Sequence, residues 1–207
     1  AGSTNQPVAM DFSWSSANRA SSYRLDVSEQ SNFSTLYFVD STIAGTSRQV
    51  TLTYNTLYYW RVRAHNAGGA GSYSPSRSFT TVIQSPAVPV LAAPDSGVTG
   101  LPLTLNLVWR SAARAASYTI QVSQNSNFSS VPIGQTGWTD TVLTIGPLPY
   151  LTQYYWRVSA TNAGGTSGWS AVRTFQTVIE PPTIPTLLTP AYNAIGLSTT
   201  VSFAWTA

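Results

Sequence analysis

Acid–base chemistry in this chain would depend on seven carboxylates, because the chain has no cysteine and only one histidine. Glycoside hydrolysis, for example, needs two carboxyl groups about 5–9.5 Å apart across the sugar bond. Asp26 and Glu29 are the pair closest in sequence, but a related segment further along carries Gln121 and Gln124 at those positions. A pair present in only one of two related segments is better explained as solvent-exposed charge. We therefore expect no catalytic residue among the carboxylates, which are Asp11, Asp26, Glu29, Asp40, Asp95, Asp140 and Glu180.

The remaining catalytic residue types give no better support for an enzyme. His65 is the only histidine, and its counterpart in the related segment is Thr161. A Ser-His-Asp triad or a histidine metal site would have to be built around this one side chain. The basic residues are all arginine, which excludes a Schiff-base lysine and a Lys–Asn isopeptide crosslink. We therefore expect a protein that is not an enzyme and that has no metal site and no cofactor.

The composition also limits the partners. The net charge is +3, but only 8% of the residues are charged, and the arginines are scattered from Arg19 to Arg173. A nucleic-acid surface needs clustered basic side chains, so no nucleic-acid partner is expected. No run of 18 apolar residues is present, so no membrane insertion is expected. A surface that is polar mainly through Ser, Thr, Asn and Gln is common in exported proteins, which favours an extracellular or cell-surface location.

Three aromatic residues near loops are the candidate ligand-contact residues. Tyr73 and Trp169 occupy the same position in the two related segments, and Trp138 lies beside another loop. Aromatic rings in loops can stack on glycans, and this is one interpretation. The alternative, which we favour, is that the rings lie at contacts between neighbouring domains or chains.

Four residues are candidate glycosylation sites. Asn32 and Asn127 begin N-x-S sequons on equivalent turns. Ser41 and Thr141 follow Asp40 and Asp140 and are similar to the Asp-Ser/Thr sites that some bacteria O-glycosylate. All four matches are short.

The chain is a tandem repeat. Residues 58–69 return as residues 154–165, an offset of 96, and Trp14, Trp109 and Trp205 are spaced 95 and 96 residues apart. In residues 154–161 apolar side chains alternate with polar ones, which predicts a strand with one face in a core. The Asn-x-Gly-Gly sequence that follows predicts a turn with positive φ. Seven short strands per repeat favour tandem Greek-key β-sandwiches of the immunoglobulin type, an all-β fold.

Two proline-containing stretches divide the repeats. Residues 82–89 and 178–185 predict extended, semi-rigid linkers. The expected units are 1–82, a repeat without its first strand; 83–179, a complete repeat; and 180–207, the first two strands of a third. The missing strand corresponds to residues 87–93 of the second repeat and 183–189 of the third, and residues 1–7 show no strand pattern.

The repeat resembles the fibronectin type III family. The matching residues include Leu52, Thr56, Tyr58, Trp60 and Val62, and they recur 96 positions later as Leu148, Thr152, Tyr154, Trp156 and Val158. The Tyr-Tyr-Trp-Arg-Val form is similar to repeats in secreted and surface proteins of bacteria. The resemblance implies a tyrosine corner at Tyr58 and Tyr154, with each hydroxyl bonded to nearby backbone. The Arg-Gly-Asp adhesion sequence of the family is absent from the loops at 67–75 and 163–171.

The alternation assigns the tryptophans and arginines to opposite faces. Trp14, Trp60, Trp109 and Trp156 are expected in the cores. Tyr59, Tyr155, Arg61 and Arg63 are expected on the outer face, where the arginines would pair with Asp26 of the adjacent strand.

The expected function is a non-enzymatic extracellular structural array: a spacer, stalk or filament subunit that contacts neighbouring repeats or copies of itself through exposed strand edges. The rival is a carbohydrate-binding or adhesion module attached to a secreted hydrolase, with glycans as partners. Because the ends are out of phase with the repeats, we expect a window from a longer array. Donor-strand assembly, in which the C-terminal strand of one subunit completes the next, is the alternative. Residues 192–207 repeat what residues 1–16 supply, which argues against it.

Overall fold

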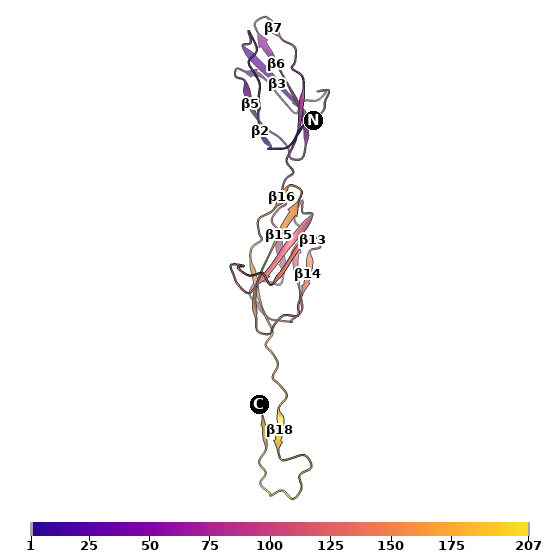
Figure 1. Ribbon diagram of the computed structural model, residues 1–207, viewed down its shortest axis with the longest axis vertical. Helices are drawn as coiled ribbons and strands as arrows, with labels where there is room; N and C mark the ends of the chain where they lie inside the picture. Colours follow the sequence, from indigo (N-terminus) through magenta and orange to yellow (C-terminus); the bar gives the residue numbers. More distant parts are fainter. Residues whose placement is uncertain (1, 207) are drawn as a thin grey trace.

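The computed structural model describes residues 2–206, which form two sandwiches and a strand pair arranged one after another along a single long axis (Figure 1). Every regular element in this range is a β-strand, which confirms the all-β prediction. No helix in the described range is long and apolar enough to cross a membrane.

The second sandwich has two sheets. One has the strand order β14-β11-β9, and the other has the order β10-β17-β15-β12-β13, with β16 added beside β15. All of these pairs are antiparallel except β10 with β17, which is parallel. The strands are β9 (Val90–Ala93), β10 (Val98–Leu101), β11 (Leu105–Arg110), β12 (Ser117–Ser123), β13 (Ile133–Trp138), β14 (Val142–Ile145), β15 (Gln153–Asn162), β16 (Gly165–Thr166) and β17 (Arg173–Thr177).

The first sandwich repeats this topology with one difference. Its larger sheet has the order β1-β8-β6-β3-β4 with β7 beside β6, but its smaller sheet contains only β2 and β5. The strands are β1 (Ser3–Gln6), β2 (Ala9–Ser13), β3 (Ser22–Ser28), β4 (Phe38–Ile43), β5 (Ser47–Thr51), β6 (Leu57–Asn66), β7 (Gly69–Ala70) and β8 (Arg77–Thr81).

The first strand of the repeat is divided between the two sheets. In the second sandwich β9 pairs with β11, and the chain then crosses to the other sheet, where β10 pairs with β17. In the first sandwich β1 pairs with β8 in the manner of β10, so the expectation that residues 1–7 form no strand was wrong. What the first sandwich lacks, within the described residues, is a counterpart of β9.

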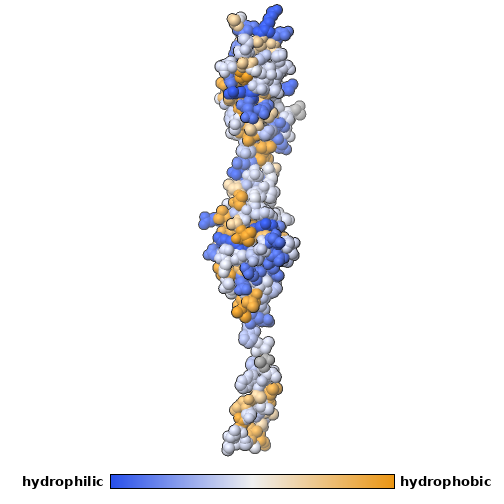
Figure 2. Space-filling view, turned by 90° about the vertical axis from the view of Figure 1, so that its left-hand side faces the viewer, coloured by the Kyte–Doolittle hydropathy of each residue, from blue (hydrophilic) through white to orange (hydrophobic). Residues whose placement is uncertain are grey.

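A strand pair follows the second sandwich. β18 (Thr186–Thr189) and β19 (Ala204–Thr206) correspond in register to β9 and β11: Leu187 lies opposite Trp205 as Leu91 lies opposite Trp109. The side chains of Leu187, Phe203 and Trp205 are largely exposed. Apolar residues are visible on the surface of this unit, at the bottom of Figure 2.

The period-two pattern correctly predicts the core strands. Val158 and Ala160 of β15 are fully buried, as are Trp109 of β11 and Trp156 of β15. In the first sandwich Trp14 and Trp60 pack against the core cluster around Phe12, but both are only partly buried. The prediction that all four tryptophans are core residues is therefore confirmed for the second sandwich, but Trp14 and Trp60 are only partly buried.

The turns after β6 and β15 have the predicted geometry. Gly69 and Gly165 adopt φ values of 120° and 127°, in the region that favours glycine. The side chains of Asn66 and Asn162 support these turns, because each Oδ1 accepts a hydrogen bond from the amide two residues later, at 2.8 and 2.7 Å.

The tyrosine corner is formed in only one repeat. In the first, the Tyr58 hydroxyl accepts a hydrogen bond from the Thr53 amide at 3.2 Å, and the Thr53 hydroxyl lies 2.7 Å away. In the second, Pro149 stands at the Thr53 position and has no amide hydrogen to donate. The Tyr154 ring is buried, but the expected hydroxyl bond is not found in the described residues, so this part of the prediction was wrong.

Candidate functional site

The outer face of the larger sheet carries a stack of arginine and aromatic side chains in the first sandwich. The Arg61 guanidinium lies between two rings, 4.0 Å from the centroid of Phe33 and 3.8 Å from that of Tyr73. Arg63 lies on the same tyrosine ring at 4.7 Å. Such cation–π contacts stabilise a site by roughly 0.5–2 kcal/mol each, with the larger values for desolvated pairs.

The second sandwich has the same stack. Arg157 lies between Phe128, at 3.9 Å, and Trp169, at 4.4 Å. Its guanidinium also donates two hydrogen bonds to Gln121 Oε1, at 2.9 and 2.7 Å. Tyr73 therefore contacts two arginines of its own sheet, and Trp169 contacts one. Trp169 is 37% exposed, and its contact with another domain or chain stays a prediction.

The sequence predicts a solvent-exposed outer face around Asp26, but the structure differs. The Asp26 side chain is buried, and its carboxylate accepts hydrogen bonds from Arg24 Nε at 2.6 Å and Arg61 Nη2 at 3.3 Å. Arg63 contacts the Tyr73 ring instead, and its Nε has no hydrogen-bond partner among the described residues. The cross-strand ion pair of Asp26 is thus present for Arg61 and was wrongly predicted for Arg63.

The charge of Asp26 makes the stability of the first sandwich depend on pH. Burial alone would raise the pKa of Asp26, but hydrogen bonds from Arg24, then the Tyr73 hydroxyl, and the charge of Arg24 outweigh it and lower the pKa below its usual value. A carboxyl group whose pKa is lower in the folded state than in the unfolded state, where it is near 3.9, stabilises the fold at pH values above that unfolded pKa. This stabilisation is lost as the pH falls through the folded-state pKa.

We therefore expect acid to destabilise the first sandwich more than the second, which has Gln121 at this position. Hydrogen exchange of β6 and β15 at a series of pH values between 7 and 3 measures each sandwich separately. Asp26→Asn should remove most of the acid sensitivity of β6, leaving that of Asp40, whose pKa is lowered by hydrogen bonds from Thr42. Equal acid sensitivity of β6 in the parent and Asp26→Asn chains would contradict this assignment.

Trp138 is held within its own domain. It is partly buried against the core of the second sandwich, and its Nε1 donates a hydrogen bond to the Val142 carbonyl at 3.0 Å. This position links the end of β13 to the start of β14. The geometry favours a packing role for Trp138, and its contact with a ligand stays a prediction.

Of the four candidate glycosylation residues, Asn32, Asn127 and Thr141 lie in turns or bends, and Ser41 lies in the edge strand β4. Asn32, Asn127 and Ser41 are exposed, and Thr141 is half-buried. The Asn32 and Asn127 side-chain oxygens each accept a hydrogen bond at 3.0 Å from the amide of the sequon serine. Modification at these positions stays a prediction.

The linker is bound to the tip of the second sandwich. Asn162 Nδ2 donates to the Gln84 carbonyl at 2.9 Å, and Arg114 Nε donates to the Ser85 carbonyl at 3.1 Å. The backbone also passes directly over Gly164, where a Cβ atom would lie 2.2 Å from the Ile83 oxygen. A glycine at position 164 is therefore required for this close approach.

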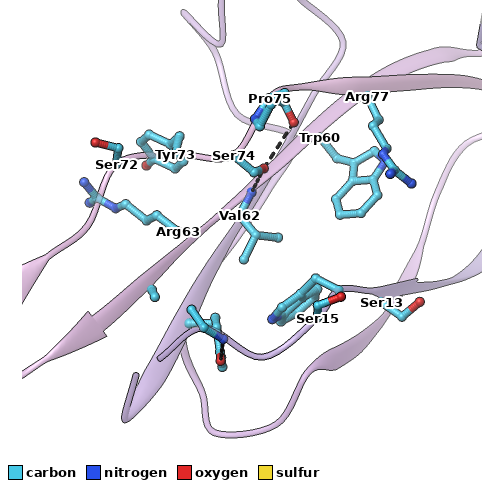
Figure 3. Close-up of a pocket in the computed structure, with 14 residues that line it drawn as sticks. Ser13, Ser15, Trp60, Val62, Arg63, Ser72, Tyr73, Ser74, Pro75 and Arg77 are labelled. Atoms are coloured by element: carbon cyan, nitrogen blue, oxygen red, sulfur yellow. Dashed lines mark hydrogen bonds between the residues drawn. The ribbon is translucent and has the colours of Figure 1, made fainter. Parts of the chain in front are cut away.

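The first sandwich has an open groove beside the end of β2. The groove has a volume of about 750 Å³, and Figure 3 shows Ser13 and Ser15 on one side with Val62, Ser74 and Pro75 facing them. Trp60 and Arg77 lie at one end, and Arg63 and Tyr73 at the other. A smaller hollow of about 280 Å³ lies at the tip around Arg19, Asn66 and Gly68.

Sequence reasoning missed the stacks and the groove. The recurrence of Arg61 as Arg157, together with an aromatic residue at positions 73 and 169, was a signal for the stacks. The signal for the groove was the expectation that the first repeat lacks the strand equivalent to residues 87–93, because Trp14, Tyr23 and Trp60 of the lining are retained in the second repeat. No group of three or more His, Cys, Asp or Glu side chains able to hold a metal ion occurs in the described range.

Comparisons with known proteins agree with this fold. A family model described as the Rha78A-like, N-terminal immunoglobulin domain matches residues 104–179. No curated protein matches the chain. Together with the strand order, this domain match confirms the resemblance to the fibronectin type III fold, an immunoglobulin-like β-sandwich.

Two solved structures are similar. The FN1–FN3 domains of chicken CNTN1 have a TM-score of 0.40 and 16% identity, over 85% of this chain and 64% of that one. An Fn3-like protein from Clostridium thermocellum has a TM-score of 0.35 and 26% identity, over 49% of this chain and 95% of that one. The chain therefore spans less than two thirds of the CNTN1 structure.

Proposed function

We propose that this chain is a structural spacer: a non-enzymatic array of fibronectin type III-like domains in an extracellular or cell-surface protein of bacterial type. The observation that carries the proposal is the hydrogen-bonded linker. A spacer must hold adjacent domains at a fixed distance and in a fixed orientation. Pro-containing linkers without further contacts are only semi-rigid. Here the bonds from Asn162 and Arg114 tie residues 84 and 85 to the next domain.

The outer-face stacks support the same function. Because Tyr73 and Trp169 lie on arginine side chains of their own sheet, part of each ring surface is unavailable for a ligand. The stacks recur in both sandwiches at the same positions, as expected of a device that rigidifies every domain of an array. The polar, weakly charged composition suits a surface that needs solubility but no specific charged partner.

A carbohydrate-binding module is the second candidate, and the open groove favours it. Trp14, Trp60 and Tyr73 line the groove, and aromatic rings beside polar groups are typical of ligand sites. In the second sandwich the equivalent tryptophans are buried by the protein's own chain. This supports the spacer function over carbohydrate binding.

Titration of the full chain with soluble oligosaccharides, followed by tryptophan fluorescence, separates the two functions. We expect no saturable shift in the emission of the seven tryptophans. Trp14→Phe is the matched control, since it removes one indole from the groove and leaves the outer-face stacks intact. A saturable shift in the parent chain that is lost in Trp14→Phe would replace the spacer with a carbohydrate-binding module.

A further inference from the structure

The first sandwich carries a basic cluster on the outer face of its larger sheet. Arg24 of β3 meets Arg61 and Arg63 of β6 there, although the three are far apart in the sequence. Asp26 pairs with Arg24 at 2.6 Å and with Arg61 at 3.3 Å, so both of its carboxylate oxygens are engaged. Three guanidinium groups and one carboxylate give the cluster a net charge of +2.

Arg63 is the member of this cluster without a counter-charge. The described residues form four ion pairs, and none of them includes Arg63. Its Nε has no hydrogen-bond partner in this range, and its guanidinium lies 4.7 Å from the centroid of the Tyr73 ring (Figure 3). Arg24 uses its Nε for Asp26, and its terminal nitrogens bond to no other group among residues 2–206. Both arginines therefore keep donors for a further acceptor.

The placement of Arg24 and Arg63 breaks a rule of strand pairing. The two residues lie directly opposite each other on β3 and β6, where Cβ atoms are about 4.5–5.5 Å apart and like charges are destabilising. The second sandwich has Thr119 opposite Ser159 at this position, although it keeps the stack around Arg157. The fold therefore does not require two arginines here. A local choice that costs stability without a structural gain is expected at a functional site.

We propose that Arg24 and Arg63 bind the carboxylate or sulfate groups of an acidic polysaccharide. An oxyanion between the two guanidinium groups supplies the acceptor that their free donors lack. Planar guanidinium groups suit this role, because they can donate two parallel hydrogen bonds to one oxyanion. The bound anion also offsets the repulsion between the opposed arginines.

The shape of the face favours a polymer over a small ligand or a folded protein. Small-molecule sites are concave, whereas Arg24 does not line the groove or the tip hollow of the first sandwich. Protein contacts have an apolar centre with aromatic anchors. Val39 of the adjacent β4 lies opposite Asp26 and is exposed, but one such side chain is too little for that centre.

This cluster is a local exception to the weakly charged surface that suits a spacer. It gives one domain of the array a means of attachment, which goes beyond the spacer function and does not rest on it. Trp14 and Trp60 pack against the core of the first sandwich and not on its outer face. Tryptophan emission therefore reports the groove, and this cluster needs a separate assay.

The residues of the second sandwich provide a variant that removes the cluster without leaving a buried charge unpaired. Arg24→Thr, Asp26→Gln and Arg63→Ser together give the first sandwich the side chains that the second has at these positions. The amide introduced at position 26 has the role of Gln121, which accepts two hydrogen bonds from the arginine of the second stack. This triple variant should therefore unfold as cooperatively as the parent chain. Arg63→Ser alone breaks no ion pair and should weaken binding in the same direction.

Arg110→Ser is the matched control for charge. The triple variant removes two arginines and one carboxylate, so it lowers the net charge by one. Arg110 is an exposed arginine of the second sandwich, and its replacement lowers the net charge by the same amount. A difference between the two proteins then reports the cluster and not the total charge.

Surface plasmon resonance with immobilised polymers tests the proposal on the full chain. Polygalacturonate offers carboxylate groups, dextran sulfate offers sulfate groups, and dextran is the uncharged control. The parent should bind at least one acidic polymer, more weakly as salt rises, and should not bind dextran. The triple variant should bind about tenfold more weakly or worse, the loss expected for one charged hydrogen bond. Arg110→Ser should bind like the parent, and the preferred polymer identifies the anionic group.

A parent chain that binds neither acidic polymer at low salt would overturn the proposal, as would a triple variant that binds like the parent. Equal weakening by the triple variant and Arg110→Ser would also overturn it, since only total charge would then matter. Binding to polyglutamate but to neither polysaccharide would replace the polysaccharide with an acidic peptide. Each of these results leaves the spacer function standing, because that function depends on the linker.

Discussion

Replacing Trp156 with alanine is expected to destabilise the second sandwich by about 3–5 kcal/mol, the usual cost of removing a large buried aromatic ring. Trp156 is fully buried at the centre of its core cluster. Its indole Nε1 has no hydrogen-bond partner among the described residues, so the loss is one of packing alone. Since domains of this size are stable by about 5–15 kcal/mol, the change removes a large share of the total.

Trp60→Ala is the matched control, because Trp60 occupies the same position in β6 and lines the open groove. Its cost should be smaller, since part of the ring is already in contact with water. Hydrogen exchange of β15 and β6, measured by mass spectrometry, reports the two sandwiches separately. Equal destabilisation by the two substitutions would show that the groove is closed in solution.

Replacing Leu91 with alanine should cost the second sandwich about 2–5 kcal/mol, because the substitution empties the site that β9 fills. Leu91 is among the buried core residues although it lies on a short edge strand. The equivalent residue of the third repeat, Leu187, is exposed, and Leu187→Ala should change stability by no more than about 0.5 kcal/mol.

Chemical denaturation of the two variants, with exchange of β11 as the local reporter, measures this difference. The comparison is informative because the two leucines have the same register against Trp109 and Trp205. A Leu91→Ala protein as stable as the parent would mean that β9 does not pack as described. The groove of the first sandwich would then have no equivalent site in the second sandwich that is filled by β9.

The sequence predicts the strands well because their signal is local. Alternation in residues 154–161 is enough to place Trp156 and Val158 in the core, and the offset of 96 transfers this result to β6. The different burial of Trp60 and Trp156 is not predictable in this way. The two side chains and their sequence neighbours are nearly identical, and the difference arises from β9, which is far from β15 in the chain.

The candidate site residues were harder to predict for the same reason. Arg61 and Asp26 were correctly paired because they lie on adjacent strands. That Phe33 and Tyr73 also cover Arg61 depends on two loops folding over the sheet, which alternation does not encode. Substitution by a single residue also matters: Pro149 removes the tyrosine-corner bond from a repeat whose other core residues are retained.

The spacer function depends most directly on whether the linker holds the two sandwiches in a fixed arrangement. The chain contains no cysteine, so Asn32→Cys and Asn127→Cys provide two unique sites for spin labels on equivalent exposed turns. Pulsed electron spin resonance then measures the distribution of distances between the two sandwiches. We expect one narrow distribution in the doubly labelled chain, and a broad one when Gly164→Ala forces Ile83 away from the tip. A broad distribution that Gly164→Ala leaves unchanged would contradict the fixed linker and with it the spacer function.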